Sequence, residues 1–462
     1  MIEIENWLTS SKNIEKSKRH YSHFDYRTDI SRCGEYISQP KNIETHSFYP
    51  FIHYLKDMSK YSLATKELKE KHRDICYAAH IDRCIFQYYN YLLNEIYNDE
   101  CEQLGINDVA IAYRTNLKGQ SNIDFAKKAI QCIRDSGDCY IMIGDFTKFF
   151  DNLDHTYLKR QWCNLLQVSK LPPDHYAVFK NITHFSYIEL TDLLKFHNLE
   201  DSNSGHRKLN AKTRLFSPVE LREKQDLIKK NRESGIPQGS PMSGVLANIY
   251  ALEIDKRLHD FVSKFNGMYM RYSDDFIVVL PNLDEKTAIE KLKNINGFFN
   301  STDFPGIELQ PGKTQYYCFK QNHLANCGLK ISEEADCSNQ HLNFLGFTFD
   351  GDKVSLRAKA VSKYYQRMRR KAKTISLSKN YTKTGKHISK RNLYVKYSMR
   401  GAESKKGNFL TYAKRSLNKF GEDELISLVT DRNMKKVRYF LNKDYTQKKP
   451  TAKKDIIKSI EK

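Results

Sequence analysis

Long apolar runs are missing from this sequence of 462 residues. Its apolar stretches, such as FIVVL at 276–280, are far shorter than the roughly 20 residues that a helix needs to cross a bilayer. The first residues, MIEIENWLTSSK, are acidic and carry no apolar signal-peptide core. We therefore expect a cytoplasmic protein that makes no membrane contact.

Paired cysteine spacings are missing as well. The ten cysteines are scattered, no C-x-x-C pair occurs, and Cys318, Cys327 and Cys337 are spaced too loosely for a zinc ribbon. This pattern is typical of reduced thiols in the cytoplasm. Internal repeats and low-complexity segments are also absent, so a repeat architecture is excluded.

Acidic residues are scarce in the last quarter of the chain. Residues 351–462 contain 32 lysines and arginines against 9 aspartates and glutamates, whereas residues 1–350 contain 44 against 46. A nearly neutral body therefore carries a strongly basic C-terminal region. Such a region indicates a polyanion partner, with nucleic acid preferred over an anionic membrane. Tyrosines interleaved with basic residues, as in YYQRMRRKAK, favour stacking on single strands as well as phosphate contact.

Apolar periodicity and turn residues predict alternating helices and strands. The pattern predicts a largely helical region over 157–234 and a helical region after about 356. It also predicts a strand at CYIMI, ending at Gly144 and Asp145, and a hairpin at MYMRYSDDFIVVL. Further helices are expected over 73–100 (after a short strand), 121–136, 235–262 and 284–300. This order suggests an α+β fold with an antiparallel sheet.

Asp274 and Asp275 stand side by side at the predicted hairpin turn. An exposed turn would tolerate them, but Asp145 also ends a buried strand, and one sheet could bring all three carboxylates together. Three clustered carboxylates repel one another unless cations join them, and oxygen donors of this kind suit Mg²⁺. Two such ions together can catalyse the in-line attack of a hydroxyl on phosphorus.

Five segments occur in the order of the palm motifs of reverse transcriptases: GDFTKFFD, GIPQGSPMSGVLANIY, YSDD, LQPGKT and HLNFLGF. The YSDD segment resembles the Y-x-D-D signature of that family. A single x-D-D-x match is common by chance, whereas five segments in order over about 200 residues are specific. The sequence is therefore identified as reverse-transcriptase-like.

The resemblance implies a right-hand polymerase with two Mg²⁺ ions. Residues 1–125 would hold the N-terminal region and fingers, 126–350 the palm with a helical insert at 160–232, and 351–462 the basic helical thumb and extension. The implied metal ligands are Asp145, Asp274, Asp275 and the carbonyl of Phe146. The implied nucleotide contacts are Arg73, Arg114, Phe150 as the steric gate against a 2′-hydroxyl, Gln238, Gly239 and Lys313. The implied primer and template contacts are Tyr272, Leu345 and Gly346.

Within this family the sequence is most similar to the bacterial unknown-group and abortive-infection reverse transcriptases, which act in antiphage defence. The AYR and GQS segments before the first palm motif and the helical basic C-terminal region carry this narrower resemblance. It implies an RNA-directed DNA polymerase that uses dNTPs, a DNA primer or product, and a noncoding RNA encoded nearby. Three alternatives stay open: a protein-primed or untemplated DNA polymerase, an RNA-dependent RNA polymerase, and an intron-type maturase or inactive RNA-binding scaffold.

Overall fold

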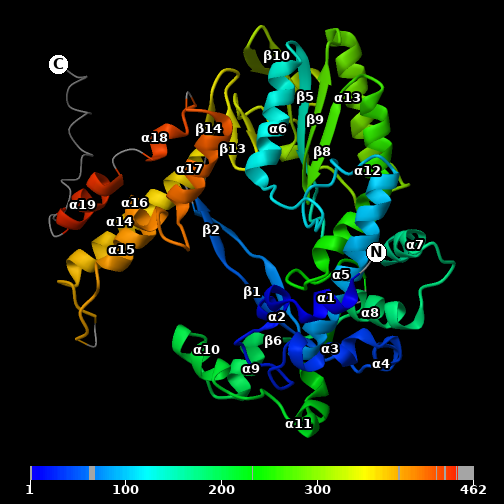
Figure 1. Cartoon of the computed structure of the whole chain (residues 1–462), viewed down its shortest axis with the longest axis vertical. Helices are drawn as coiled ribbons and strands as arrows, with labels where there is room; N and C mark the ends of the chain where they lie inside the picture. The colour runs from blue at the N-terminus through cyan, green and yellow to red at the C-terminus, as the bar shows by residue number, and fades with distance from the viewer. Residues whose placement is uncertain are drawn as a thin grey trace, which may run out of the picture. The chain divides into compact units, whose positions relative to one another are not determined.

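The computed structural model describes residues 3–61, 68–231, 233–382, 385–422, 424–430, 433–443 and 445. The chain divides into two compact units, each assembled from separate stretches of sequence, and both combine helices with strands (Figure 1). The first unit contains Met1–Gly119, Ile141–Tyr316 and Gly328–Asp336. The second contains Gln120–Tyr140, Tyr317–Cys327 and Cys337–Lys462.

The first unit holds four of the five predicted polymerase motifs, all but HLNFLGF, and most of the described helices. Its helices are α1 (Ile4–Thr9), α2 (Ser11–Ser17), α3 (Ile30–Ser38), α4 (Pro40–Glu44), α5 (His80–Gln103), α7 (His155–Leu165), α8 (Pro173–Thr183), α9 (Leu190–Phe196), α10 (Asn203–Asn210), α11 (Pro218–Glu223), α12 (Ser243–Ser263) and α13 (Glu285–Phe299). Short 3₁₀ turns lie at Gln225–Leu227, Pro311–Lys313 and Gly328–Lys330.

Three adjacent strands of one larger sheet carry the acidic motifs. Their order is β5 (Cys139–Asp145), β9 (Asp275–Pro281) and β8 (Met268–Tyr272). Every residue of β5 before its last is buried, as are the inner residues of β9. The two strands approach so closely at Gly144 that a Cβ there would meet the ring of Phe276 at 2.3 Å. Glycine is therefore required immediately before Asp145.

Helix α12 packs beside this sheet, next to β8, and α13 packs against α12 (Figure 1). The predicted helices over 73–100, 235–262 and 284–300 are confirmed as α5, α12 and α13. The predicted hairpin is also confirmed, since β8 and β9 pair in register from Met268↔Val279 to Tyr272↔Asp275.

A second sheet has the order β4-β1-β6-β7, made of β1 (Phe51–Leu55), β4 (Asp74–Tyr77), β6 (Ser186–Glu189) and β7 (Lys229–Lys230). The expectation that 157–234 is helical is confirmed for α7 to α11 but misses β6 and β7. Ile188 of β6 is fully buried and packs in one apolar cluster with Ile52 of β1. That long-range pairing turns a short polar segment into a strand. A separate hairpin joins β2 (Met58–Tyr61) to β3 (Leu68–Lys71).

The second unit combines small antiparallel sheets with helices. Its strands are β10 (Gln315–Lys320, beginning in the first unit), β11 (His323–Asn326), β12 (Leu342–Phe344), β13 (Phe347–Phe349) and β14 (Val354–Leu356). Its helices are α6 (Asn122–Asp135), α14 (Ala358–Leu377), α15 (Arg391–Tyr397), α16 (Met399–Ala402), α17 (Phe409–Phe420), α18 (Ser427–Thr430) and α19 (Asn433–Asn442). The helix predicted over 121–136 is confirmed as α6, which begins with a capping box between Ser121 and Asp124. The domain boundaries expected at 125/126 and 350/351 stay predictions.

Candidate active site

Asp145 and Asp274 lie next to each other, because the backbone of β5 joins that of the β8–β9 turn. The N–H of Phe146 donates to the carbonyl of Asp274 at 3.1 Å. Both aspartates are half-buried, whereas Asp275 is exposed at the start of β9. The sheet therefore brings two of the three predicted carboxylate positions side by side from segments 129 residues apart in sequence.

Asp274 stands on a strained two-residue turn. Tyr272 pairs with Asp275, which leaves only Ser273 and Asp274 in the loop, and Ser273 has φ +62°. Tight hairpin turns usually place glycine at a position of this kind, because a side chain disfavours positive φ. Ser273 is buried, and its backbone and side chain are both held by neighbours. Its carbonyl accepts from Nη1 of Arg271 at 2.9 Å, and its Oγ accepts from the hydroxyl of Tyr113 at 3.3 Å.

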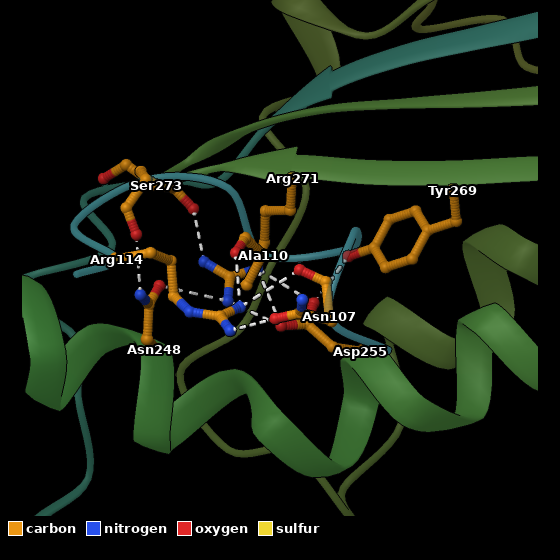
Figure 2. Close-up of polar contacts among 9 residues, drawn as sticks. Asn107, Ala110, Arg114, Asn248, Asp255, Tyr269, Arg271 and Ser273 are labelled. Carbon is orange, nitrogen blue, oxygen red and sulfur yellow. Dashed lines mark hydrogen bonds and ion pairs between the residues drawn. The ribbon is translucent and has the colours of Figure 1, made fainter. Parts of the chain in front are cut away.

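Arg271 is the centre of a buried polar network beneath this turn (Figure 2). Its Nη2 donates to Asp255 Oδ2 at 2.6 Å and its Nε to Asp255 Oδ1 at 2.8 Å, and both side chains are fully buried. Tyr269 also donates to Asp255 at 2.8 Å, and Arg271 Nη2 reaches Asn248 at 3.4 Å. Burial alone would lower the pKa of Arg271, but the Asp255 carboxylate raises it above its usual value. The guanidinium therefore stays charged in the interior.

The sequence reasoning missed this network. A single charged residue in the apolar face of helix α12, Asp255, and an arginine inside the apolar strand β8 were the signals that could have indicated it. Isolated buried charges are rare unless they are paired. A pairing hypothesis between Arg271 and Asp255 could therefore have been stated from the sequence.

Arg114 belongs to the same supporting layer. Its Nη1 donates to the carbonyl of Ala110 at 3.0 Å, its Nη2 to Asn107 and its Nε to Asn98 at 2.6 Å. The backbone of Ala110 pairs in turn with Arg271. These bonds give the guanidinium a structural role within the protein, and the expected triphosphate contact of Arg114 stays a prediction.

Lys313 reaches the first aspartate. The chain after Leu309 runs antiparallel to the end of β5, with the N–H of Gln310 bonded to the carbonyl of Asp145 at 2.8 Å. The 3₁₀ turn that follows places Nζ of Lys313 at 2.5 Å from Oδ1 of Asp145. The lysine is about half exposed and the aspartate is 20% exposed, so solvent and ligands can reach this ion pair.

The donor atoms at this site suit a hard divalent cation. Carboxylate and carbonyl oxygens are what Mg²⁺ prefers. The described residues contain no group of three or more His, Cys, Asp or Glu side chains arranged to hold a metal ion, so the expected three-carboxylate cluster is not preformed. Like charges oppose such a cluster, and Lys313 neutralises one member of it. Coordination by Asp145, Asp274, Asp275 and Phe146 stays a prediction.

Phe150, the predicted steric gate, follows Phe149 in the turn after β5. Phe149 is a core residue, since it is 2% exposed and packs against Phe146, whereas Phe150 is half-buried. The carbonyl of Phe150 accepts from the N–H of Ile236 at 2.9 Å. Gln238 also lies beside this turn and donates to Asp151 at 3.1 Å. The predicted steric gate and the predicted nucleotide loop are therefore neighbours.

Gly239 connects that loop to the β4 strand. The N–H of Cys76 donates to the carbonyl of Gln238 at 2.8 Å. Gly239 has φ +117°, and a Cβ there would lie 2.4 Å from the carbonyl oxygen of Cys76. Arg73 is exposed immediately before β4, and its backbone pairs with Lys56. Its side chain makes no hydrogen bond or ion pair with any other residue of the described ranges.

Tyr272 precedes the turn and is half-buried. Burial raises the pKa of its hydroxyl, with Tyr113 and Asp275 acting in the same direction. The ring is therefore neutral at physiological pH and available as an apolar surface.

Leu345 and Gly346 lie in the second unit and are described there alone. They form the tight turn between β12 and β13, with φ +45° and +93°. The side chain of Asn122 donates to the carbonyl of Leu345 at 2.9 Å and also to Tyr412. The N–H of Arg357 bonds to the carbonyl of Gly346 at 3.0 Å, which anchors the start of α14 to the turn.

Comparison with known proteins assigns the family. The model of the reverse transcriptase (RNA-dependent DNA polymerase) family matches residues 64–349. The chain belongs to the reverse transcriptase family. As a reverse transcriptase it is an RNA-directed DNA polymerase by class, and its α+β fold with antiparallel sheets is confirmed. No curated protein matches the sequence closely enough to be counted as a relative.

Solved structures similar to this reverse transcriptase include yeast telomerases. Apo telomerase from Candida tropicalis truncated from its C-terminal domain shares 14% identity at a TM-score of 0.37, over 76% of this chain and 66% of that chain. Apo telomerase from Candida tropicalis shares 14% at 0.38, over 95% and 76%. Telomerase from Candida albicans with a telomeric RNA fragment shares 11% at 0.37, over 90% and 68%. Among the described helices, none is long and apolar enough to cross a membrane.

Proposed function

We propose that the chain copies an RNA template into DNA by joining dNTPs to a primer 3′-hydroxyl. The observation that carries this proposal is the backbone bond between Phe146 and Asp274, which sets Asp145 and Asp274 side by side at a solvent-accessible sheet end. A carboxylate at a strand end and another on a tight turn bonded to it have fixed spacing, which phosphoryl transfer requires.

In this proposal two Mg²⁺ ions are held by Asp145, Asp274 and the carbonyl of Phe146, with Asp275 in support. When bound, such ions supply activation of the primer hydroxyl and neutralisation of charge on the phosphates. Lys313 would release Asp145 and turn its ammonium toward the departing pyrophosphate, which it can stabilise as a charge or protonate. Arg73 would hold the triphosphate through its open guanidinium.

The remaining residues select and position the substrates. Phe150 would lie under the sugar and clash with a 2′-hydroxyl, while Gln238 and Gly239 border the nucleotide. Tyr272 would rest against the primer terminus, and Leu345 with Gly346 would hold its backbone. The basic C-terminal region would bind the phosphates of template RNA and product, so binding should weaken steeply with salt.

Primer extension with an Asp274→Asn variant tests this function. The amide keeps the size of the side chain but removes its charge, so extension should fall at least about 1,000-fold. Asp260→Asn, at an exposed position on α12, is the matched control and should retain activity. Extension by Asp274→Asn at the rate of the control would overturn the proposal. DNA that stays attached to the protein after denaturation would instead indicate protein priming.

We further propose that the enzyme serves bacterial antiphage defence with a dedicated noncoding RNA. This rests on the narrower sequence resemblance and on the basic C-terminal region. Nucleic acid that copurifies with the protein would be sequenced before and after adding dNTPs and Mg²⁺, with Asp274→Asn alongside. One enriched RNA, with complementary DNA only in the active enzyme, is expected. Phage plating that is equal on cells with either protein would overturn the defence role.

A further inference from the structure

The second unit contains a helical cluster whose charges are all of one sign. Helices α14, α15 and α19 pack against one another around Met368, Ala372 and Val437, and they carry twelve lysines and arginines and no acidic residue (Figure 1). Helix α14 alone contributes seven of these cations. An unbalanced cluster of this kind repels itself, so an anionic ligand would stabilise it.

The cations of α14 divide into two groups with different surroundings. Arg369 lies 5.4 Å over the ring of Phe440, and Lys373 lies 5.9 Å over the ring of Tyr445. These two therefore serve the packing of α14 on the C-terminal segment. Arg367, Arg370 and Lys371 lie on another face and make no side-chain hydrogen bond or ion pair with the residues that the structure describes.

That other face opens into a cavity of about 390 Å³. Its floor is apolar and aromatic, formed by Ile375, which is 2% exposed, with Ile388 and Tyr397. Its rim is cationic. The residues that line it are Arg367, Arg370, Lys371, Thr374, Ile375, Ile388 and Tyr397. The volume is in the range of small-ligand sites.

We infer that this cavity binds one nucleotide of a single-stranded RNA. An unpaired base presents a planar apolar face that fits the floor of Ile375, Ile388 and Tyr397, and the adjoining phosphate fits the guanidinium rim. Arg367 and Arg370 are three residues apart on one helix, so both can reach one phosphate. In a duplex the bases are stacked inside, so no base face is free to contact the floor of the cavity. The inference rests on the proposed RNA-binding function but names a separate site, which lies outside the residues assigned to catalysis.

The test compares two double variants of the full chain that remove the same charge from the same helix. Binding of a fluorescein-labelled dodecauridylate is measured by anisotropy at fixed salt. Arg367→Ala with Arg370→Ala should weaken binding at least about tenfold, because charge-assisted hydrogen bonds to phosphate are lost. Arg369→Ala with Lys373→Ala should weaken it no more than about threefold, as expected for charge alone. Equal losses of RNA affinity in the two double variants would overturn the proposed pocket.

A second probe isolates the base. An abasic ribose-phosphate chain of the same length should bind the wild-type chain at least about fivefold more weakly, since stacking on the floor is lost. Tyr397→Leu should remove most of this preference, and a preference retained in full would overturn the floor assignment. Primer extension by the wild-type chain is measured in parallel. If the wild-type chain extends primers but the two double variants bind the RNA equally well, the pocket alone is overturned. If RNA binding depends on the pocket but the wild-type chain does not extend primers, the polymerase proposal alone is overturned.

Discussion

Every nitrogen of the Arg271 guanidinium group donates to an acceptor inside the protein. Nε and Nη2 bind Asp255, and Nη1 binds the carbonyl of Ser273, one residue before Asp274. Ser273 holds a positive φ that serine normally avoids, so the bond from Arg271 offsets backbone strain at the turn. The position of the Asp274 carboxylate therefore depends on a residue that never touches substrate.

Arg271→Lys should lower kcat while leaving the fold in place. A lysine ammonium is a compact charge that can bind Asp255 but cannot hold Ser273 at the same time in the planar geometry of arginine. We expect kcat for primer extension to fall about 100-fold and the KM for dNTP to change less than about threefold. The Mg²⁺ concentration for half-maximal activity should rise. Arg257→Lys, at an exposed ion pair on α12, is the control. A loss of kcat that only follows the loss of folded protein would contradict this positioning role.

Phe150→Ala should admit ribonucleotides. Phe149 fills the core, whereas Phe150 is half-buried, and its ring is the proposed steric gate against a 2′-hydroxyl. We expect the ratio of kcat/KM for dGTP over GTP to fall at least about tenfold, mainly through faster GTP use. Single-nucleotide incorporation opposite a template cytidine measures both. An unchanged ratio would assign the ring to packing and leave sugar selection to another residue.

At the scale of elements, local sequence patterns correctly predicted those helices and strands whose formation depends on interactions between residues close in sequence. The capping box at Ser121 marks the start of α6 in the sequence, and the apolar run after Asp275 marks β9. Strands β6 and β7 could not be predicted, because Ser186–Glu189 becomes a strand only through pairing with β1. The backbone conformation of the turn at Ser273 could not be predicted either, because the turn has no glycine and its positive φ is stabilised by the bond from Arg271. The candidate catalytic aspartates were predicted from motifs, whereas the network that supports them depends on contacts distant in sequence.

Two glycine-to-alanine substitutions distinguish a required glycine from a tolerated one. Gly239→Ala would place a Cβ at 2.4 Å from the carbonyl of Cys76 at φ +117°, so it should destabilise the first unit by about 1–3 kcal/mol. Gly297→Ala lies in helix α13 with open space around its Cβ and should stabilise by about 0.5–1 kcal/mol. Urea unfolding curves of both variants measure these changes. A neutral Gly239→Ala would show that the loop between Gln238 and β4 moves without strain.

At the scale of the whole molecule, acid and salt act on different parts of the chain. The first unit buries several histidines, and burial lowers the pKa values of His23, His155, His175 and His197. A histidine held neutral in the interior makes folding less favourable as the medium becomes acidic. The second unit has its excess of positive charge at the surface instead, where salt would control the proposed RNA binding. Loss of fold and loss of RNA binding should therefore be separable by solution conditions.

His23→Gln should make the first unit less sensitive to acid. His23 is fully buried, donates one bond from Nε2 to the carbonyl of Tyr77, and has a pKa lowered by burial to about 3. Between pH 6.5 and 3 the unfolded chain binds a proton that the folded chain does not, so the free energy of unfolding falls as pH falls through this window. Glutamine has no group that binds this proton. The slope of the unfolding free energy against pH should therefore decrease by at most about 1.4 kcal/mol per pH unit.

The measurement is urea unfolding at several pH values between 7.5 and 4.5, followed by tryptophan fluorescence. His20→Gln is the control, since His20 is exposed and three residues away. Its unfolding free energy should follow that of the wild-type chain across the pH range, because its surroundings differ little between the folded and unfolded states. If His23→Gln and His20→Gln gave parallel curves, the acid sensitivity of this unit would arise from its other buried histidines, because no proton would then be taken up at His23 on unfolding.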